Sequence, residues 1–214
     1  MALVLVLRWV PPFTSAFILE AHARLWLSGD FHTSIQQRWT DLAHISPNAQ
    51  LAVIASEDQR FPFHHGFDFD SMQDALEGDL DGERFRGGST LSQQTAKNLF
   101  LWGGRSYVRK GIEAWFTGLM ELLWPKRRIL EMYLNLAQFG PDVYGVQAAA
   151  RHFFHKDAAA LSRGEAAVLA GVLPNPHVLH AERPSAYLAS RREWILRQMH
   201  ALGDTGYLRN LGQP

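Results

Sequence analysis

The sequence predicts a mainly α-helical protein built around one principal domain. Hydrophobic residues recur at helical spacing in several segments, and two capping boxes, Thr90 to Gln93 and Ser162 to Glu165, mark helix starts. Segments with the alternation typical of strands are few. The chain has 214 residues, of which 47% are hydrophobic and 20% charged. This is the composition of a globular protein that is long enough to bury a substantial core.

The N-terminal segment allows two interpretations. Residues 2–10 (ALVLVLRWV) are apolar, but the run is short and Arg8 interrupts it. A membrane-spanning helix needs about 20 apolar residues, and a secretory signal carries its positive charge before the apolar run. The segment is either a buried first element or the tail of a membrane anchor. We assign 1–20 to such an anchor remnant and 21–214 to the main domain.

The first half of the main domain contains four predicted helices. Pro11 and Pro12 end any helix in the N-terminal segment. The helices are expected over 16–27, from Ser46-Pro47 to about Asp58, from Phe67 to about Leu80, and over 90–100, with a polar loop over 82–88. In the first of them, the residues available for burial are Phe17, Leu19, Ala23 and Trp26.

The second half continues the helical pattern. One apolar stripe precedes Pro125 and consists of Val108, Ile112, Trp115, Leu119 and Leu122. The next stripe ends before Gly140 and consists of Ile129, Leu130, Tyr133, Leu134 and Ala137. Ser162 and Glu165 then begin a helix that ends at Pro174, and an amphipathic helix covers 185–202.

Composition and charge exclude several classes of function. The chain has no cysteine, which excludes a disulfide scaffold, a thiolate zinc site and a cysteine nucleophile. Lys and Arg number 21 and Asp and Glu also number 21. Because proteins that bind nucleic acid are usually basic, we expect no nucleic-acid partner.

The neutral total conceals a sharp division of charge. Acidic residues dominate 57–83, whereas every charged side chain over 84–112 is a Lys or an Arg. The basic block also contains the run GGSTLSQQ, whose hydroxyls and amides suit sugars, while the cations suit phosphate. The helix start at Thr90 adds backbone donors for an anion. The alternative is an ordinary solvated surface.

Two carboxylates have unusual settings. Glu57 ends the apolar run LAVIASE and precedes aromatic residues, so burial should raise its pKa toward that of a base working near neutral pH. Its alternative role is pairing with Arg60. Glu113 follows Arg109 by one helical turn, and an ordinary salt bridge between them is the simplest interpretation.

Other polar residues favour structural roles. Glu131 is expected to pair with Arg127 or Arg128. His152 and His155 could share a helix face, but no third metal ligand accompanies them. No metal site is therefore predicted.

Five blocks, taken in order, resemble the monofunctional biosynthetic peptidoglycan transglycosylases and the glycosyltransferase domain of bifunctional penicillin-binding proteins. The blocks are EDQRFPFHHGFD (57–68), GGSTLSQQTAKN (87–98), RSYVRKGIE (105–113), RRILEMYLN (127–135) and GEAAVLAGVLPNP (164–176). The resemblance covers about residue 10 to the C-terminus. Continuous matches at WVPP and WILRQM (194–199) favour the single-domain enzyme.

The resemblance implies a lysozyme-like helical head with a smaller, membrane-facing jaw lobe. It implies an enzyme that polymerises lipid II into β-1,4-linked glycan strands, inverts the donor anomeric carbon and releases undecaprenyl diphosphate. Expected partners are lipid II, the growing lipid-linked strand, the membrane surface and other cell-wall synthases. The expected location is the periplasmic side of the bacterial inner membrane, where the enzyme would serve cell-wall biogenesis and cell shape.

The resemblance also assigns roles to residues. Glu57 matches the catalytic base and Glu113 the second catalytic carboxylate, which would help to organise the leaving diphosphate. The matched cations are Lys97, Arg105, Arg109 and Lys110. The other matched substrate-binding residues are Asp58, Phe61, His64, Gly66, Ser89, Thr90, Gln93, Gln94 and Asn98. A divalent cation, Mg²⁺ or Mn²⁺, would assist the diphosphate, although the sequence contains no dedicated ligand set.

Elementary chemistry supports these roles and leaves alternatives open. A base acting on the attacking hydroxyl contributes about 10²–10⁴-fold, and a departing diphosphate needs cations and no general acid. Candidate lipid contacts, with core packing as the alternative, are Phe85, Leu99, Phe100, Leu101 and Trp102. A lytic glycosidase of lysozyme-like fold would have no need for the basic block. An inactive wall-binding module is the remaining alternative.

Overall fold

The computed structural model describes residues 1–69, 88–104 and 106–212. The helix expected from Phe67 to Leu80 and the loop expected over 82–88 lie, apart from their ends, outside the described residues, as does Arg105.

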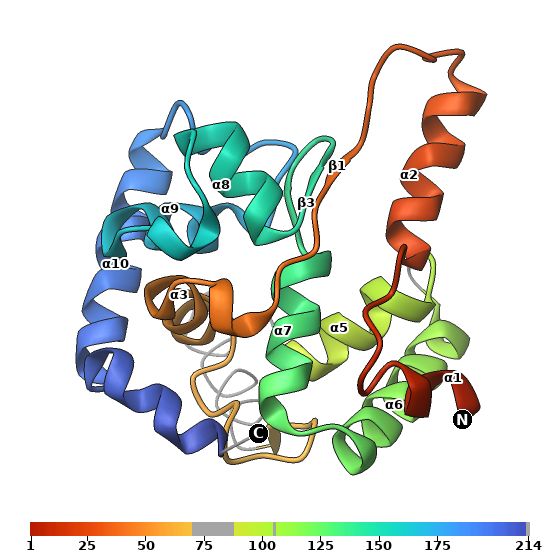
Figure 1. Cartoon of the computed structure of the whole chain (residues 1–214), viewed down its shortest axis with the longest axis horizontal. Coiled ribbons are helices and arrows are strands. Elements are labelled where there is room, and N and C mark those ends of the chain that lie inside the picture. The colour runs from red at the N-terminus through yellow and green to blue at the C-terminus, as the bar shows by residue number, and fades with distance from the viewer. Residues whose placement is uncertain (70–87, 105, 213–214) are drawn as a thin grey trace.

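The described chain is mainly helical, as predicted (Figure 1). Its α-helices are α1 (Ala2–Val6), α2 (Ala16–Leu27), α3 (Pro47–Glu57), α5 (Leu91–Phe100), α6 (Tyr107–Leu123), α7 (Lys126–Leu136), α8 (Val146–Phe154), α9 (Arg163–Val172) and α10 (Ala186–Ala201). Short 3₁₀ helices are η1 (Leu42–His44), η2 (Ala158–Ala160) and η3 (Asp204–Leu211).

A small sheet joins distant parts of the chain. Its strands are β1 (Gln36–Gln37), β2 (Gln138–Gly140) and β3 (Val143–Tyr144), in the order β1-β3-β2. β1 runs parallel to β3 with Gln36 opposite Val143, and β2 runs antiparallel to β3 with a shift in register. The sheet ties the segment after α2 to the hairpin after α7.

Side-chain caps fix the helix starts. Ser46 accepts a hydrogen bond from the backbone of Asn48 at the start of α3. Both halves of the capping box are present at Thr90 and at Ser162. Each capping box satisfies two backbone donors that the first turn leaves unpaired. The predicted helix starts are therefore confirmed.

Helix α3 forms the centre of the core. Residues 49–55 along α3 are all buried. α9 and α10 pack against α3, while α5 packs against α6 and α7 (Figure 1). The predicted stripe of α7 is buried throughout, from Ile129 to Ala137. The end of α3 is thereby held where these two groups of helices meet.

The burial expected for α2 was wrong. Ile18 and Ala21 are its buried residues, whereas Leu19 and Trp26 are 57% and 73% exposed. α2 packs on α5 and stands at the edge of the molecule (Figure 1). A helix that packs on one neighbour buries only a narrow face.

The apolar stripe of α6 forms the predicted helix but faces largely outward. Val108, Trp115 and Leu122 are 71%, 66% and 76% exposed. The buried residues of α6 are Glu113 and Thr117 together with Met120 and Leu119, the last of which belongs to the predicted stripe. The helix therefore buries two polar side chains beside two apolar ones and leaves part of its apolar stripe on the surface.

The N-terminal segment docks on the main domain. Val4 and Leu7 are buried, the indole of Trp124 donates to the Val4 carbonyl at 2.7 Å, and Arg128 donates to the Leu7 carbonyl. The remaining apolar side chains of this segment, among them Trp9, are exposed. Within the described ranges, no helix combines the length and apolarity needed to cross a bilayer.

Candidate active site

Glu57 is the last residue of α3 and is held by three side chains. Its Oε2 accepts a hydrogen bond from Gln94 Nε2 at 3.1 Å, and its Oε1 accepts one from Ser56. Nη2 of Arg191, on α10, lies 3.5 Å from Oε1. The side chain is only 14% exposed. Burial raises the pKa of Glu57, while Gln94 and Arg191 oppose the rise. The described structure does not contain the alternative, an ion pair between Glu57 and Arg60.

A buried tyrosine fixes the amide that contacts Glu57. The Tyr133 hydroxyl donates to Gln94 Oε1 at 3.1 Å, so the amide NH₂ faces the carboxylate. Burial raises the pKa of Tyr133 well above its ordinary value, with the charge of Glu57 acting in the same direction. The hydroxyl therefore stays protonated and keeps donating.

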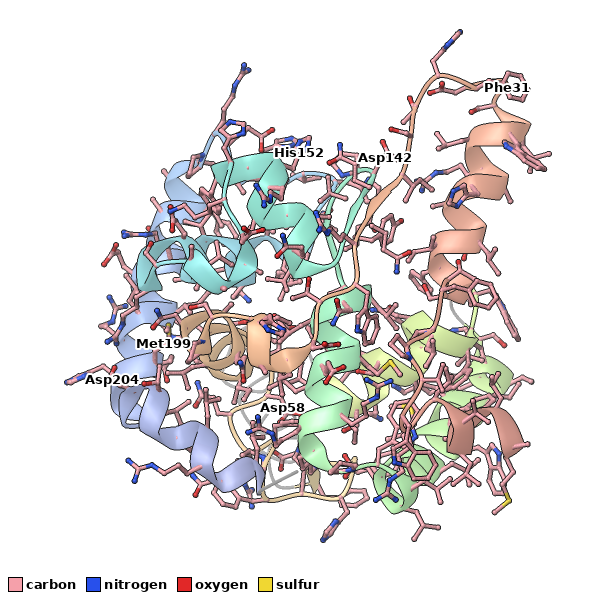
Figure 2. The ribbon with its side chains drawn as sticks, viewed as in Figure 1. Phe31, Asp58, Asp142, His152, Met199 and Asp204 are labelled. Carbon is pink, nitrogen blue, oxygen red and sulfur yellow. The ribbon has the colours of Figure 1, made fainter. Side chains whose placement is uncertain are left out.

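The loop after Glu57 is tied to the start of α5. Asp58 accepts a hydrogen bond from the backbone of Leu91 at 2.9 Å and another from His64 Nε2 at 2.9 Å. His64 Nδ1 in turn accepts from the backbone of Gly66, whose carbonyl accepts from the Thr90 hydroxyl at 2.7 Å. Figure 2 shows Asp58 below α3, beside α7. These residues form the frame of the site.

Several residues expected to bind substrate lie deep in this frame. Phe61 is fully buried, and Lys126 Nζ lies 4.6 Å from its ring centroid. Gln93 is buried as the partner of Thr90 in the capping box. Gly66 has a φ of +86°, and a Cβ there would meet the Thr117 methyl at 2.7 Å. Glycine is therefore required at this position.

Glu113 lies between two cations on α6. Arg109 Nη1 lies 2.8 Å from Oε2 and Lys110 Nζ lies 2.5 Å from Oε1, while Glu113 itself is 2% exposed. The expected pair with Arg109 is confirmed, and Lys110 adds to it. Among the described residues, Arg109 Nε finds no hydrogen-bond partner although it is buried.

The charges of Glu57 and Glu113 both act on Lys97. Burial is the main cause that lowers its pKa, and the charges of Glu113, Arg109, Lys110 and Glu57 all act on it. Its Nζ lies 5.4 Å from the ring centroid of Phe17. The charges of both Glu57 and Glu113 thus contribute to the electrostatic environment of Lys97.

A cavity opens beside these groups. It has a volume of about 200 Å³, and its lining includes Gln94, Lys97, Asn98 and Tyr133. The half-buried Ser89 lies nearby, and its carbonyl accepts from Gln94 at 3.4 Å. Three of the expected residues, Gln94, Lys97 and Asn98, thus line this cavity, and Ser89 contacts one of them.

Two residues of the site were missed by the sequence analysis. Tyr133 was assigned to the core stripe of α7, although a buried tyrosine hydroxyl needs a partner and that requirement was the available signal. Arg191 lies on α10, far from Glu57 in sequence, and no local pattern points to it. Only the packing of α10 against α3 brings it to the carboxylate.

The remaining expectations for polar residues concern Glu131, His152 and a metal site. Glu131 pairs with Arg128 at 2.5 Å, as expected. His152 contacts Gln36 and lies on α8, well apart from Asp58 (Figure 2). Over the ranges that the structure describes, no group of three His, Asp or Glu side chains could hold a metal ion. The donors around Glu57 and Glu113 likewise do not fit a resident metal site.

The candidate lipid contacts are mostly core residues. Leu99 and Leu101 are buried, and Phe100 stacks on Phe116 with ring centroids 4.3 Å apart. Trp102 is 53% exposed. Phe85 lies outside the described residues.

Comparison with known proteins shows the family to which the chain belongs. The family model described as Transglycosylase matches residues 27–200. A biosynthetic peptidoglycan transglycosylase of Chromohalobacter salexigens is 56% identical over 209 residues, covering 98% of this chain and 89% of the relative. Proteins of the same name from Pseudomonas entomophila and Xanthomonas euvesicatoria are 54% and 52% identical, covering 98% and 96% of this chain and 89% and 83% of the relatives. The chain therefore belongs to the biosynthetic peptidoglycan transglycosylases, a family of glycosyltransferases.

Proposed function

We propose that this enzyme polymerises lipid II into β-1,4-linked glycan strands. The Glu57 carboxylate takes the proton from the 4-hydroxyl of the acceptor GlcNAc, and that oxygen bonds to the anomeric carbon of the donor. The bond from this carbon to the diphosphate breaks, and undecaprenyl diphosphate leaves with the electron pair. The donor is α-linked and the product β-linked, so a single displacement inverts the centre.

The surroundings of Glu57 support its role as base. Burial raises the pKa of the carboxyl, so its ionised form accepts a proton more readily than an ordinary glutamate does. The hydrogen bond from Gln94, which Tyr133 holds in place, fixes the orientation of the carboxylate. A base held in position contributes about 10²–10⁴-fold to the rate.

The cations of α5 and α6 support the departure of a diphosphate. Lys97 is half-buried and would gain an anionic partner when the diphosphate binds. Arg109 has a spare Nε donor within the described structure, and Lys110 is 47% exposed. Each fixed charge aimed at a developing anion can contribute about 3 kcal/mol. Glu113 would keep Arg109 and Lys110 in position for this task.

The pairing of Glu113 with Arg109 and Lys110 is the observation that carries the proposal. A raised pKa at Glu57 alone would also suit the general acid of a lytic glycosidase. A glycosidase, however, needs a second carboxylate as nucleophile or base, whereas both oxygens of Glu113 are engaged by cations. A neutral leaving group would also give the cluster nothing to stabilise.

We also propose that a divalent cation binds together with the substrate diphosphate. Because the described residues do not fit a resident metal, we expect Mg²⁺ or Mn²⁺ to arrive with the diphosphate. No step of the displacement is assigned to it.

We place the enzyme at the periplasmic surface of the inner membrane. Lipid II and the growing strand would reach it there, and other cell-wall synthases would be its partners. The exposed stripe of α6, Val108, Trp115 and Leu122, supports this location because exposed apolar patches mark sites of interaction with membranes or proteins. α1 packs against α6 and adds its own exposed apolar side chains, including Trp9.

The test is to incubate the protein with lipid II or with isolated cell-wall sacculi, and to analyse the products in the presence and absence of a chelator. We expect glycan strands from lipid II and no cleaved sugars from sacculi. Cleaved wall sugars without any strand formation would favour the glycosidase, and inertness toward both would favour the binding module. Loss of strand formation with the chelator, restored by Mg²⁺ or Mn²⁺, would support the companion cation.

A further inference from the structure

Arg191 reaches Glu57 from a different part of the fold. It lies in the first half of α10, and its Nη2 is 3.5 Å from Glu57 Oε1. The side chains of Arg191 and Glu57 are 13% and 14% exposed, so the pair is screened little by water. Among the described residues, Glu57 is the only carboxylate with which Arg191 forms an ion pair.

Packing holds the arginine in place. α10 approaches α9 closely at Gly171, where a Cβ would meet Leu188 at 2.7 Å and lie 4.0 Å from Arg191 Cγ. The guanidinium also lies 5.9 Å from the ring centroid of Trp194. Its Nε is buried without a hydrogen-bond partner in the part of the chain that the structure describes. The aliphatic part of the Arg191 side chain thus packs in the interface between α9 and α10, and the guanidinium charge acts on Glu57.

The other charged groups around Glu57 do not replace Arg191. Asp58 follows in sequence and disfavours ionisation of Glu57, while Tyr133 on α7 and Gln94 on α5 are uncharged. Lys97 on α5 also acts electrostatically with Glu57, but it is shared with Glu113.

Charged groups of the remaining neighbours face elsewhere. On η3, Tyr207 donates to the Gln59 carbonyl and Asp204 pairs with Arg163 of α9. Glu165, also on α9, pairs with Lys156. Arg191 is therefore the nearest cation that the described structure offers to Glu57.

We propose that Arg191 is a positioning residue that keeps Glu57 in its ionised, proton-accepting form at neutral pH. The inference rests on the proposed function, in which Glu57 must be a base. Without the cation beside it, burial would raise the pKa of Glu57 further and enlarge the protonated fraction that can act only as an acid. Arg191 would thus determine which of the two roles this glutamate can perform.

The test compares pH profiles of kcat/KM for lipid II polymerisation in the wild type, R191M, R191K and R192M. R191M keeps the stem that packs against α9 and removes the charge, whereas Arg192 is a more exposed neighbour paired with Glu193. An opposite charge at this distance lowers a carboxyl pKa by about 1 or more. We expect R191M to lose about tenfold on the acid side of the profile and to approach the wild type within about twofold on the alkaline side. R191K and R192M should keep the wild-type profile.

A loss in R191M that is equal at every pH, or no loss at all, would overturn the proposal. R191Q repeats the comparison if circular dichroism shows that R191M does not fold. A second readout is the NMR titration of ¹³C-labelled glutamate carboxyls, with E57Q identifying the Glu57 signal. That signal should titrate at higher pH in R191M than in wild type. This arm needs no substrate, so it still tests Arg191 if the enzyme fails to polymerise lipid II.

Discussion

The carboxylate of Glu57 is placed where folding disfavours its charge. It is largely buried, ends the C-terminal turn of α3 and precedes Asp58, and burial is the main cause of its raised pKa. Functional groups of this kind often reduce stability, because the geometry that chemistry needs differs from the geometry that folding favours. Arg191 and Gln94 offset part of this effect.

E57Q should therefore be more stable than wild type at pH 8. The pKa of Glu57 is higher in the folded protein than in the unfolded chain. Ionisation of Glu57 therefore hardly changes the free energy of unfolding at pH 4, and it lowers that free energy increasingly as the pH rises through the folded pKa. We expect a melting temperature higher by about 3 °C at pH 8 and nearly equal at pH 4. E193Q, which changes a more exposed carboxylate, is the control. Lower stability of E57Q at pH 8 would show that Arg191 and Gln94 outweigh burial.

At the level of secondary structure, one capping residue serves both α5 and the site. Thr90 completes the capping box of α5 and also donates to the Gly66 carbonyl, which anchors the loop after Glu57. Ser162 completes an equivalent box on α9 and also bonds to Glu165. The two caps make the same pair of capping hydrogen bonds, but only the cap at Thr90 is linked to the site.

T90A and S162A should both lower stability, by about 1 kcal/mol for the lost cap, which corresponds to about 2–4 °C in melting temperature. T90A should in addition reduce kcat for strand formation several-fold, because the loop that follows Glu57 loses an anchor. Thermal unfolding and initial rates at a temperature where both variants are folded check this. Equal activity of the two variants would mean that the Gly66 contact does not affect the site.

At the scale of the whole molecule, patterns local in sequence could be predicted and contacts between distant segments could not. Caps and apolar spacing gave the bounds of α3, α5 and α9, and the setting of Glu57 pointed to a perturbed carboxylate. The partnership of Glu57 with Arg191 depends on how α10 packs, and periodicity along α10 carries no such information.

The α6 stripe shows a second limit of prediction from sequence. Helical spacing of apolar residues identified the helix, but it could not distinguish a core-facing stripe from one exposed on the surface. The buried face of α6 holds Glu113 beside Leu119 and Met120, and Arg109 and Lys110 pair with that carboxylate. An ion-paired carboxylate can therefore share the inner face of a helix with apolar side chains.

The exposed stripe predicts membrane binding. W115E should weaken binding of the protein to vesicles of anionic phospholipid by about tenfold, since a large apolar side chain contributes about 1.5–3 kcal/mol when buried. Y187E is the control, because Tyr187 on α10 is exposed to a similar degree, 54% against 66% for Trp115. Co-sedimentation with vesicles measures both. Equal loss in the two variants, or none in W115E, would contradict a membrane role for this face.

The central claim is that Glu57 accepts the proton of the attacking hydroxyl within a site whose cations receive the diphosphate. The most direct measurement is the rate at which the first glycosidic bond forms from saturating lipid II, in wild type and in E57Q. A rate at least about 100-fold lower in E57Q, with lipid II binding retained, is the result we predict. Bond formation by E57Q at the wild-type rate would contradict the account.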